Sequence, residues 1–213
     1  MLVGQRMSQP VITVSPDTPI PEALKLMRSE KISRTPVVEN GKMVGIVTEN
    51  DLLNASPSKA TTLSIWEINY LLSKVTVREV MTKKVYTIDE DCPIEEAACR
   101  MADKDVSGLP VVRNGEVVGI ITEHDLFKIF IEMMGARQPG LRVSVLLPNQ
   151  PGEIAKLSRI IYENGGDIIG LGSFAGESIS NFMVTVKISG ISEKKIRSLL
   201  EPIAIRVVDI RKA

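Results

Sequence analysis

The chain has 213 residues, 44% of them hydrophobic and 24% charged, which is the balance of a globular protein with one large or two ordinary domains. Lys plus Arg and Asp plus Glu both total 26, and this neutrality argues against a nucleic-acid-binding or membrane-surface role. No apolar run is long enough to span a bilayer, and the N-terminus lacks a signal-peptide pattern, so we expect a cytoplasmic protein.

Few residues are available for catalysis or metal binding. Cys92 and Cys99 are the only cysteines, and their spacing fits neither a CxxC pair nor a structural disulfide, so we expect two free thiols in a reducing compartment. His124 is the only histidine, which nearly excludes His-based zinc sites and His-Asp triads. With no cofactor fingerprint either, the sequence predicts a protein that is not an enzyme and has no metal or cofactor site.

Two stretches of the chain share one pattern. Residues 7–54 align with residues 81–128 without a gap, and nearly half of the positions are identical. In chain order each copy has a strand-like run, at 11–14 or 85–88, and then a helix with a proline at its start. Two β-branched runs joined by Asn-Gly follow, which predicts a hairpin with a type I′ turn. A closing helix completes a β-α-β-β-α unit.

Each hairpin leads into a Thr-x-x-Asp sequence, from Thr48 to Asp51 and from Thr122 to Asp125. One interpretation is a helix N-cap, in which the threonine hydroxyl accepts a backbone N–H and the acid lies in the positive first turn. The other is a ligand site, because a helix N-terminus presents N–H groups to a phosphate and the nearby carboxylate can accept ribose hydroxyls. Two copies of the sequence after the same hairpin favour the ligand site.

The segment at 61–76 lies between the copies and has no counterpart in the repeat. Its apolar residues between Leu63 and Leu72, including the single tryptophan Trp66, recur at helical spacing in two stripes. A helix that is apolar on so much of its circumference is buried in the core of its own chain or at a subunit contact. Both alternatives remain open.

Breaker residues at 135–140 predict a linker, and residues 141–213 beyond it follow a different plan. Their runs predict the order β-α-β-β-α-β, which is ferredoxin-like. The sequence therefore predicts an α/β (α+β) protein. Its predicted parts are a first motif at 1–60, a connecting helix at 61–76, a second motif at 77–134, the linker at 135–140 and a C-terminal domain at 141–213.

The first 134 residues resemble a tandem pair of cystathionine-β-synthase-type (CBS) domains. The resemblance rests on Arg34-Thr35-Pro36-Val37-Val38 with Val44-Gly45-Ile46-Val47-Thr48-x-x-Asp51, and on Gly108-Leu109-Pro110-Val111-Val112 with Val118-Gly119-Ile120-Ile121-Thr122-x-x-Asp125. It implies two motifs packed as a pseudo-twofold pair, with two clefts that hold AMP, ADP, ATP or related adenosyl compounds.

The same resemblance implies roles for individual residues. Asp51 and Asp125 would bind ribose hydroxyls, while Thr48 and Thr122 would contact phosphate. The other nucleotide-binding residues that it implies are Thr13, Arg34, Thr35, Pro36, Thr87, Ser107, Leu109, Pro110 and His124. Because Gly108 stands where the first copy has Arg34, we expect the two clefts to differ in charge.

Residues 141–213 resemble an ACT domain, a regulatory module that often binds an amino acid between two copies. The match is the β-α-β-β-α-β order together with Asn149-Gln150-Pro151-Gly152 and Gly165-Gly166-Asp167-Ile168. It implies an amino-acid site at Asn149, Gly152 and Ile169. The other interpretation is that Pro151-Gly152 only starts a helix and that nothing binds there.

Two CBS motifs followed by an ACT domain resemble bacterial acetoin-utilisation (AcuB-type) proteins. This order implies a cytoplasmic, energy-sensing regulatory homodimer, whose partners are an adenosyl ligand, an amino acid at the ACT domain and an unidentified regulated protein. The alternative is an assembly module that has lost ligand binding and scaffolds a partner enzyme. The retention of both Thr-x-x-Asp sequences favours the sensing protein.

Overall fold

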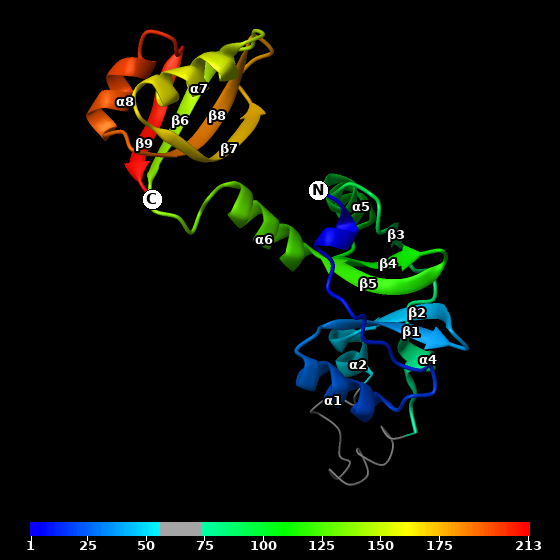
Figure 1. Cartoon of the computed structure of the whole chain (residues 1–213). Coiled ribbons are helices and arrows are strands. Elements are labelled where there is room, and N and C mark those ends of the chain that lie inside the picture. Colours follow the sequence, from blue (N-terminus) through cyan, green and yellow to red (C-terminus); the bar gives the residue numbers. More distant parts are fainter. Residues whose placement is uncertain (56–73) are drawn as a thin grey trace. The chain divides into compact units, whose positions relative to one another are not determined.

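The computed structural model describes residues 1–55 and 74–213 (Figure 1). The predicted connecting helix, with Trp66, falls mostly outside these ranges. The chain divides into two compact units, Met1–Leu126 and Phe127–Ala213. The division lies inside helix α6 (Glu123–Met133) and therefore ahead of the linker predicted at 135–140. No helix in the described ranges combines the length and apolar character needed to cross a membrane.

The N-terminal unit contains the two predicted copies of one motif. The first copy consists of α1 (Ile20–Glu30), β1 (Arg34–Glu39), β2 (Lys42–Thr48) and α2 (Glu49–Asn54). The second consists of β3 (Ile88–Asp89), α5 (Ile94–Lys104), β4 (Gly108–Arg113), β5 (Glu116–Thr122) and α6. A short helix precedes each copy, η1 (Val3–Gln5) in one case and α4 (Val77–Val80) in the other.

Both hairpins have the predicted turn. Asn40 and Gly41 have φ angles of 51° and 76°, and Asn114 and Gly115 have φ angles of 51° and 85°. A type I′ turn requires positive φ at both central residues, which asparagine and glycine tolerate better than other residues. The repeated turn is one reason why the two hairpins have matching registers, and it confirms the predicted hairpins.

The first strand of each copy is shorter than the sequence predicts. Val14 makes a single parallel bridge with Val37, and only β3 remains of the strand expected at 85–88. The chain before each of these positions pairs elsewhere, because Ser8 bridges Ile120 and Thr82 bridges Ile46. The leading segment of each copy therefore pairs with the second hairpin strand of the other copy. Few residues of the expected strands at 11–14 and 85–88 are left to pair in their own sheet.

The two cores are completed by this exchange. Val3 is fully buried in the core of the second copy, with Leu109 and Ile121, and Val77 is fully buried in the core of the first copy. The crossing is tight. A Cβ added at Gly119 would lie 2.3 Å from Met7 Sδ, and Met81 Sδ would lie 2.7 Å from a Cβ at Gly45. Glycine at both positions lets the crossing segment approach the sheet.

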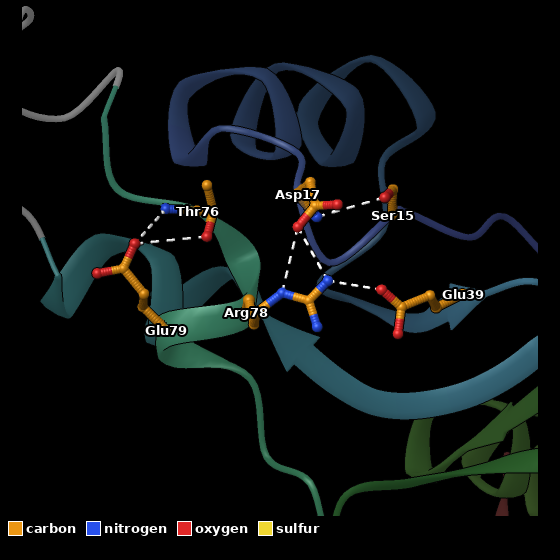
Figure 2. Close-up of polar contacts among 6 residues, drawn as sticks. All are labelled: Ser15, Asp17, Glu39, Thr76, Arg78 and Glu79. Atoms are coloured by element: carbon orange, nitrogen blue, oxygen red, sulfur yellow. Dashed lines mark hydrogen bonds and ion pairs between the residues drawn. The ribbon is translucent and has the colours of Figure 1, made fainter.

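A polar cluster fastens α4 to the first copy (Figure 2). The Arg78 guanidinium donates to Asp17 Oδ1 from Nε at 3.2 Å and from Nη2 at 2.9 Å, and Nη2 also donates to Glu39 Oε1 at 2.6 Å. These carboxylates raise the pKa of Arg78, and the hydrogen bond that Arg78 donates to Glu39 is the largest cause. A residue just ahead of the second copy thus makes its ion pairs with the first.

The C-terminal unit has its elements in the predicted β-α-β-β-α-β order. They are β6 (Leu141–Pro148), α7 (Glu153–Glu163), β7 (Asp167–Ala175), β8 (Asn181–Ser189), α8 (Glu193–Leu200) and β9 (Arg206–Lys212). The strands form an antiparallel sheet in the order β7-β8-β6-β9, so the ferredoxin-like prediction is confirmed.

One face of this sheet is covered by α7 and α8, and the opposite face is called the second face below. Val143, Val145, Val184 and Val186 form one core with residues of α7 and α8, such as Leu157. Because side chains alternate along a strand, the intervening residues of β6 and β8 point to the second face. The end of α6 packs close to β7 there, since a Cβ added at Gly170 would lie 2.6 Å from the Met134 carbonyl carbon.

Candidate functional site

A pocket of ≈ 310 Å³ lies where the two copies meet in the N-terminal unit. The first copy contributes Arg34, Ile46, Thr48 and Asp51. The second copy contributes two segments, 82–86 and 105–108. Their lining residues are Thr82, Lys84, Val85, Tyr86, Asp105, Val106, Ser107 and Gly108. The structure thus brings the predicted residues Arg34, Thr48, Asp51 and Ser107 into one pocket.

Thr48 and Asp51 form a capping box at the start of α2. The Asp51 backbone N–H donates to Thr48 Oγ1 at 3.2 Å, and Asp51 Oδ2 accepts from the Thr48 backbone N–H at 2.8 Å and from its hydroxyl at 2.7 Å. The N-cap interpretation of the sequence is therefore correct at this position. It does not exclude a ligand role, because Asp51 Oδ1 takes part in none of these bonds.

The second Thr-x-x-Asp sequence makes two of the same contacts. Asp125 Oδ2 accepts from the Thr122 backbone N–H at 3.1 Å and from its hydroxyl at 2.7 Å. Asp125 is 8% exposed, and neither residue lines the ≈ 310 Å³ pocket. A backbone hydrogen bond also connects the start of each helix to the loop before its hairpin. Glu49 N–H donates to the Ser33 carbonyl at 2.9 Å, and Glu123 N–H donates to the Ser107 carbonyl at 3.2 Å.

Arg34 is the cation that distinguishes this pocket. Its side chain passes over Gly108, where an added Cβ would lie 2.6 Å from Nη1 and 3.0 Å from Cδ. Burial lowers the pKa of Arg34, and the opposing charge of Glu123 raises it. Its Nε is buried and has no hydrogen-bond partner among the described residues. A guanidinium in this state is suited to receive an anion.

The segment at 82–86 supplies functional residues that were not predicted from the sequence. Lys84 brings a second cation to the pocket, and Tyr86 brings an aromatic ring. Lys104 Nζ lies 5.6 Å from the centroid of the Tyr86 ring, close enough for a cation–π contact. The sequence contains little signal for them, because Thr82 pairs with Ile46 in β2 of the other copy and this pairing is not visible in the residue pattern.

The other predicted nucleotide-binding residues do not line this pocket. Thr35 is buried and its hydroxyl donates to the Ile12 carbonyl at 2.5 Å, while the Thr87 carbonyl accepts from Arg100 Nη1 at 2.6 Å. Thr13 and His124 are exposed, and the remaining predicted residues are buried strand residues, namely Pro36, Leu109 and Pro110. Their side chains support the hairpins.

In the C-terminal unit, an open pocket of ≈ 590 Å³ surrounds the turn at 149–152, where the resemblance implies an amino-acid site. It is lined by Asn149 and Gly152, but Ile169 is not among its lining residues. Ile169 is the extra residue of a β-bulge between Ile168 and Gly170, and its side chain lies against Gly135. Asn149 Nδ2 donates to the Ile179 carbonyl at 2.9 Å, which ties the turn to the β7–β8 loop.

No group of three or more His, Cys, Asp or Glu side chains in the described ranges is arranged to hold a metal ion. Cys92 is half-buried, Cys99 is exposed, and both are free thiols.

The family model of the CBS domain matches residues 3–58 and 77–132. These ranges contain more than half of the chain and include the two aligned copies, so the chain belongs to the CBS-domain family. L-aspartate semialdehyde sulfurtransferase of Methanocaldococcus jannaschii is 35% identical over 131 residues, which are 61% of this chain and 23% of that enzyme. The chain thus spans less than a quarter of that relative's length.

Solved structures resemble the chain over a similar share of its length. The CBS domain pair of protein MJ0100, in complex with 5′-methylthioadenosine and S-adenosyl-L-methionine, is 33% identical with a TM-score of 0.52, covering 65% of this chain and 98% of that chain. A proposed acetoin utilization protein (AcuB) from Vibrio cholerae is 28% identical with a TM-score of 0.53, covering 65% of this chain and 96% of that chain.

Proposed function

We propose that the ≈ 310 Å³ pocket binds an adenosyl compound that carries phosphate, and that the protein is a regulatory sensor of such ligands. The observation that carries this proposal is the convergence of Asp51, Arg34 and Tyr86 on one pocket at the junction of the copies. The MJ0100 domain pair, which binds two adenosyl compounds, supports the ligand class.

Each part of the ligand has a matching group in the pocket. The Asp51 carboxylate offers Oδ1 to ribose hydroxyls while Oδ2 stays in the capping box. Tyr86 offers a ring face to the base, with Val85 and Val106 as apolar surroundings. Arg34 and Lys84 offer positive charge to phosphate, and this role rests on the side chains because α2 has only six residues.

Arg34 also favours one group of adenosyl ligands over another. S-adenosylmethionine carries a sulfonium cation, which the Arg34 guanidinium would repel. Methylthioadenosine has no charge for Arg34 to bind. AMP, ADP and ATP carry phosphate that a buried guanidinium can bind through charge-assisted hydrogen bonds. We therefore propose a preference for adenine nucleotides.

Calorimetric titration with AMP, ADP, ATP, methylthioadenosine and S-adenosylmethionine tests the proposal. Asp51→Ala should weaken binding by about 1.5–3 kcal/mol, the range for hydrogen bonds to a charged group. Asp125→Ala is the matched control and should leave binding at this pocket unchanged. It removes the corresponding contact with Thr122 in the second copy, and Asp125 does not line this pocket. If the wild-type chain binds none of these compounds, the sensing function is wrong and a scaffolding module is the better description.

The proposal also covers the oligomeric state, location and regulatory role of the protein. We infer a cytoplasmic homodimer that regulates a partner protein and catalyses no reaction itself. The resemblance to AcuB-type proteins supports this role, and the sulfurtransferase match covers too little of that enzyme to transfer its activity. Gel filtration with light scattering tests the dimer, and a monomer at micromolar concentration would contradict it.

We also propose that the C-terminal unit is an ACT domain that senses an amino acid at the ≈ 590 Å³ pocket. The ferredoxin-like strand order supports the assignment. Glu153, which lines this pocket, is 4% exposed and accepts from Lys156 Nζ at 2.7 Å, so it holds a charge close to the turn. Titration with the twenty amino acids checks this role, and binding of none would leave the turn as a helix start only.

A further inference from the structure

A third pocket, of ≈ 300 Å³, lies on the second face of the C-terminal sheet, away from α7 and α8. Its apolar wall is formed by Phe130 and Met134 from α6 and the residues after it, and by Phe174 from β7. Its polar residues are Arg142, Thr185 and Lys187. The pocket lies entirely within the unit Phe127–Ala213 and shares no lining residue with the pocket at 149–152.

Lys187 is an unusual residue at the base of this face. It is only 4% exposed, and the neighbouring Val186 and Ile188 belong to the core on the opposite face of β8. The alternation of the strand therefore places Lys187 with Thr185 on the pocket side. No hydrogen bond or ion pair among residues 1–55 and 74–213 involves the Lys187 ammonium group.

The other polar groups of the pocket already have partners. Arg142 Nη1 donates to Asp209 Oδ2 at 3.0 Å, and the hydroxyls of Ser144 and Thr185 share a hydrogen bond of 2.9 Å. Asp209 is also bound by Arg211, at 2.8 Å from each of its carboxylate oxygens. The single negative charge of Asp209 therefore neutralises only one of the two positive charges of Arg142 and Arg211. Lys187 adds a further positive charge without a described counter-ion.

Lys187 thus brings a positive charge to the wall of an apolar pocket, with its side chain enclosed by protein and no described protein group paired with it. An apolar pocket with a single unpaired cation has the polarity of a site for an anion with an apolar body. A cavity of this size is at the lower end of the range for ligand pockets, which favours a small molecule.

We infer that this pocket is a binding site for a small carboxylate with an apolar body. The carboxylate pairs with the Lys187 ammonium and reaches the Thr185 hydroxyl, and the hydrocarbon part packs against Phe130, Met134 and Phe174. This site is independent of the adenosyl pocket, because its residues belong to the other compact unit.

The test uses the full-length chain labelled with ¹⁵N, with hexanoate as the probe and hexan-1-ol as the uncharged analogue. Hexanoate should shift amide resonances of β8 and Phe174 in a saturable manner, and hexan-1-ol should bind more weakly. Lys187→Met should weaken hexanoate binding by about tenfold to a hundredfold, the equivalent of one charge-assisted hydrogen bond. Lys194→Met, the same substitution at an exposed position of α8, should bind hexanoate as the wild type does.

Thermal unfolding with and without hexanoate provides a second readout. Hexanoate should raise the melting temperature of the wild-type chain and have a smaller effect on Lys187→Met, because a ligand that binds only the folded state stabilises it according to its affinity. The proposal is overturned if hexanoate causes no saturable shift, if the shifts fall away from β8 and Phe174, or if Lys187→Met binds hexanoate with wild-type affinity.

Discussion

The first and second copies of the motif share their hairpins and crossing segments and differ in the charges around them. Both have an Asn-Gly hairpin and a Thr-x-x-Asp cap, and both receive a leading segment from the other copy. Where the copies meet, the first copy has Arg34 and the second has Gly108. One position therefore gives the ≈ 310 Å³ pocket a cation that the repeat by itself does not supply.

The outer ion pairs of the two copies also differ. Glu39 of the first copy binds Arg78, which precedes the second copy, whereas the equivalent residue Arg113 binds Glu90 within its own copy. The backbone of the motif is thus maintained by apolar and turn residues common to both copies. Surface charges are free to change sign, because exposed ion pairs contribute little to stability.

The largest expected difference between the copies concerns the leucine of the closing helix. Leu52 is fully buried in the first core, while its equivalent Leu126 is partly buried against the second. Leu52→Ala should lower the free energy of unfolding by about 2–5 kcal/mol, the range for a truncated core leucine. Leu126→Ala should cost less because it leaves a smaller cavity. Urea unfolding of both variants measures this, and equal losses would contradict the comparison.

The charge difference at the pocket should appear in ligand preference. Arg34→Gln should weaken AMP and ATP binding by about 1.5–3 kcal/mol and leave methylthioadenosine binding nearly unchanged, because only phosphate uses the charge. Gly108→Ala should act in the same direction, since the added Cβ would displace the Arg34 side chain. Calorimetry of both variants decides, and an equal loss for phosphorylated and uncharged ligands would refute the role of Arg34.

The threonines of the two Thr-x-x-Asp sequences should contribute equally to stability, in contrast to the differences above. Thr48→Ala and Thr122→Ala each remove a hydroxyl that is bonded to the following aspartate. Each should lower stability by about 0.5–2 kcal/mol, the usual range for an N-cap. Thr→Ser at the same positions keeps the hydroxyl and serves as the control. A loss at only one threonine in chemical unfolding would show that the repeated sequence caps only one helix.

The smallest effect concerns pH. The hydrogen bond from Arg113 holds the pKa of Glu90 below its usual value. Because the folded pKa is depressed, the stabilisation is present above the ordinary glutamate pKa of about 4.3 and is lost as pH falls through the lower folded value. Arg113→Gln should therefore lower the melting temperature slightly at neutral pH and not in strong acid. Arg159→Gln, at an exposed position, is the control, and a difference that persists in acid would contradict the assignment.

The local structure was readable from the sequence because it depends on neighbouring residues. The Asn-Gly turns follow from the φ angles that these two residues tolerate, and the caps follow from the reach of a threonine hydroxyl to the third residue of a helix. The β-α-β-β-α-β order of the C-terminal unit was predictable for a similar reason, since alternating and helical spacing identify each element separately. The equivalence of the two copies followed from their alignment.

Contacts between distant segments were decided only by the tertiary structure. Nothing in the spacing shows that Val3 completes the core of the second copy, or that Thr82 crosses to Ile46 and shortens the strand expected at 85–88. The same exchange brings Lys84 and Tyr86 to the pocket of Asp51. Sequence patterns record which face of an element is apolar, whereas the partner of that face is selected by packing among all segments at once.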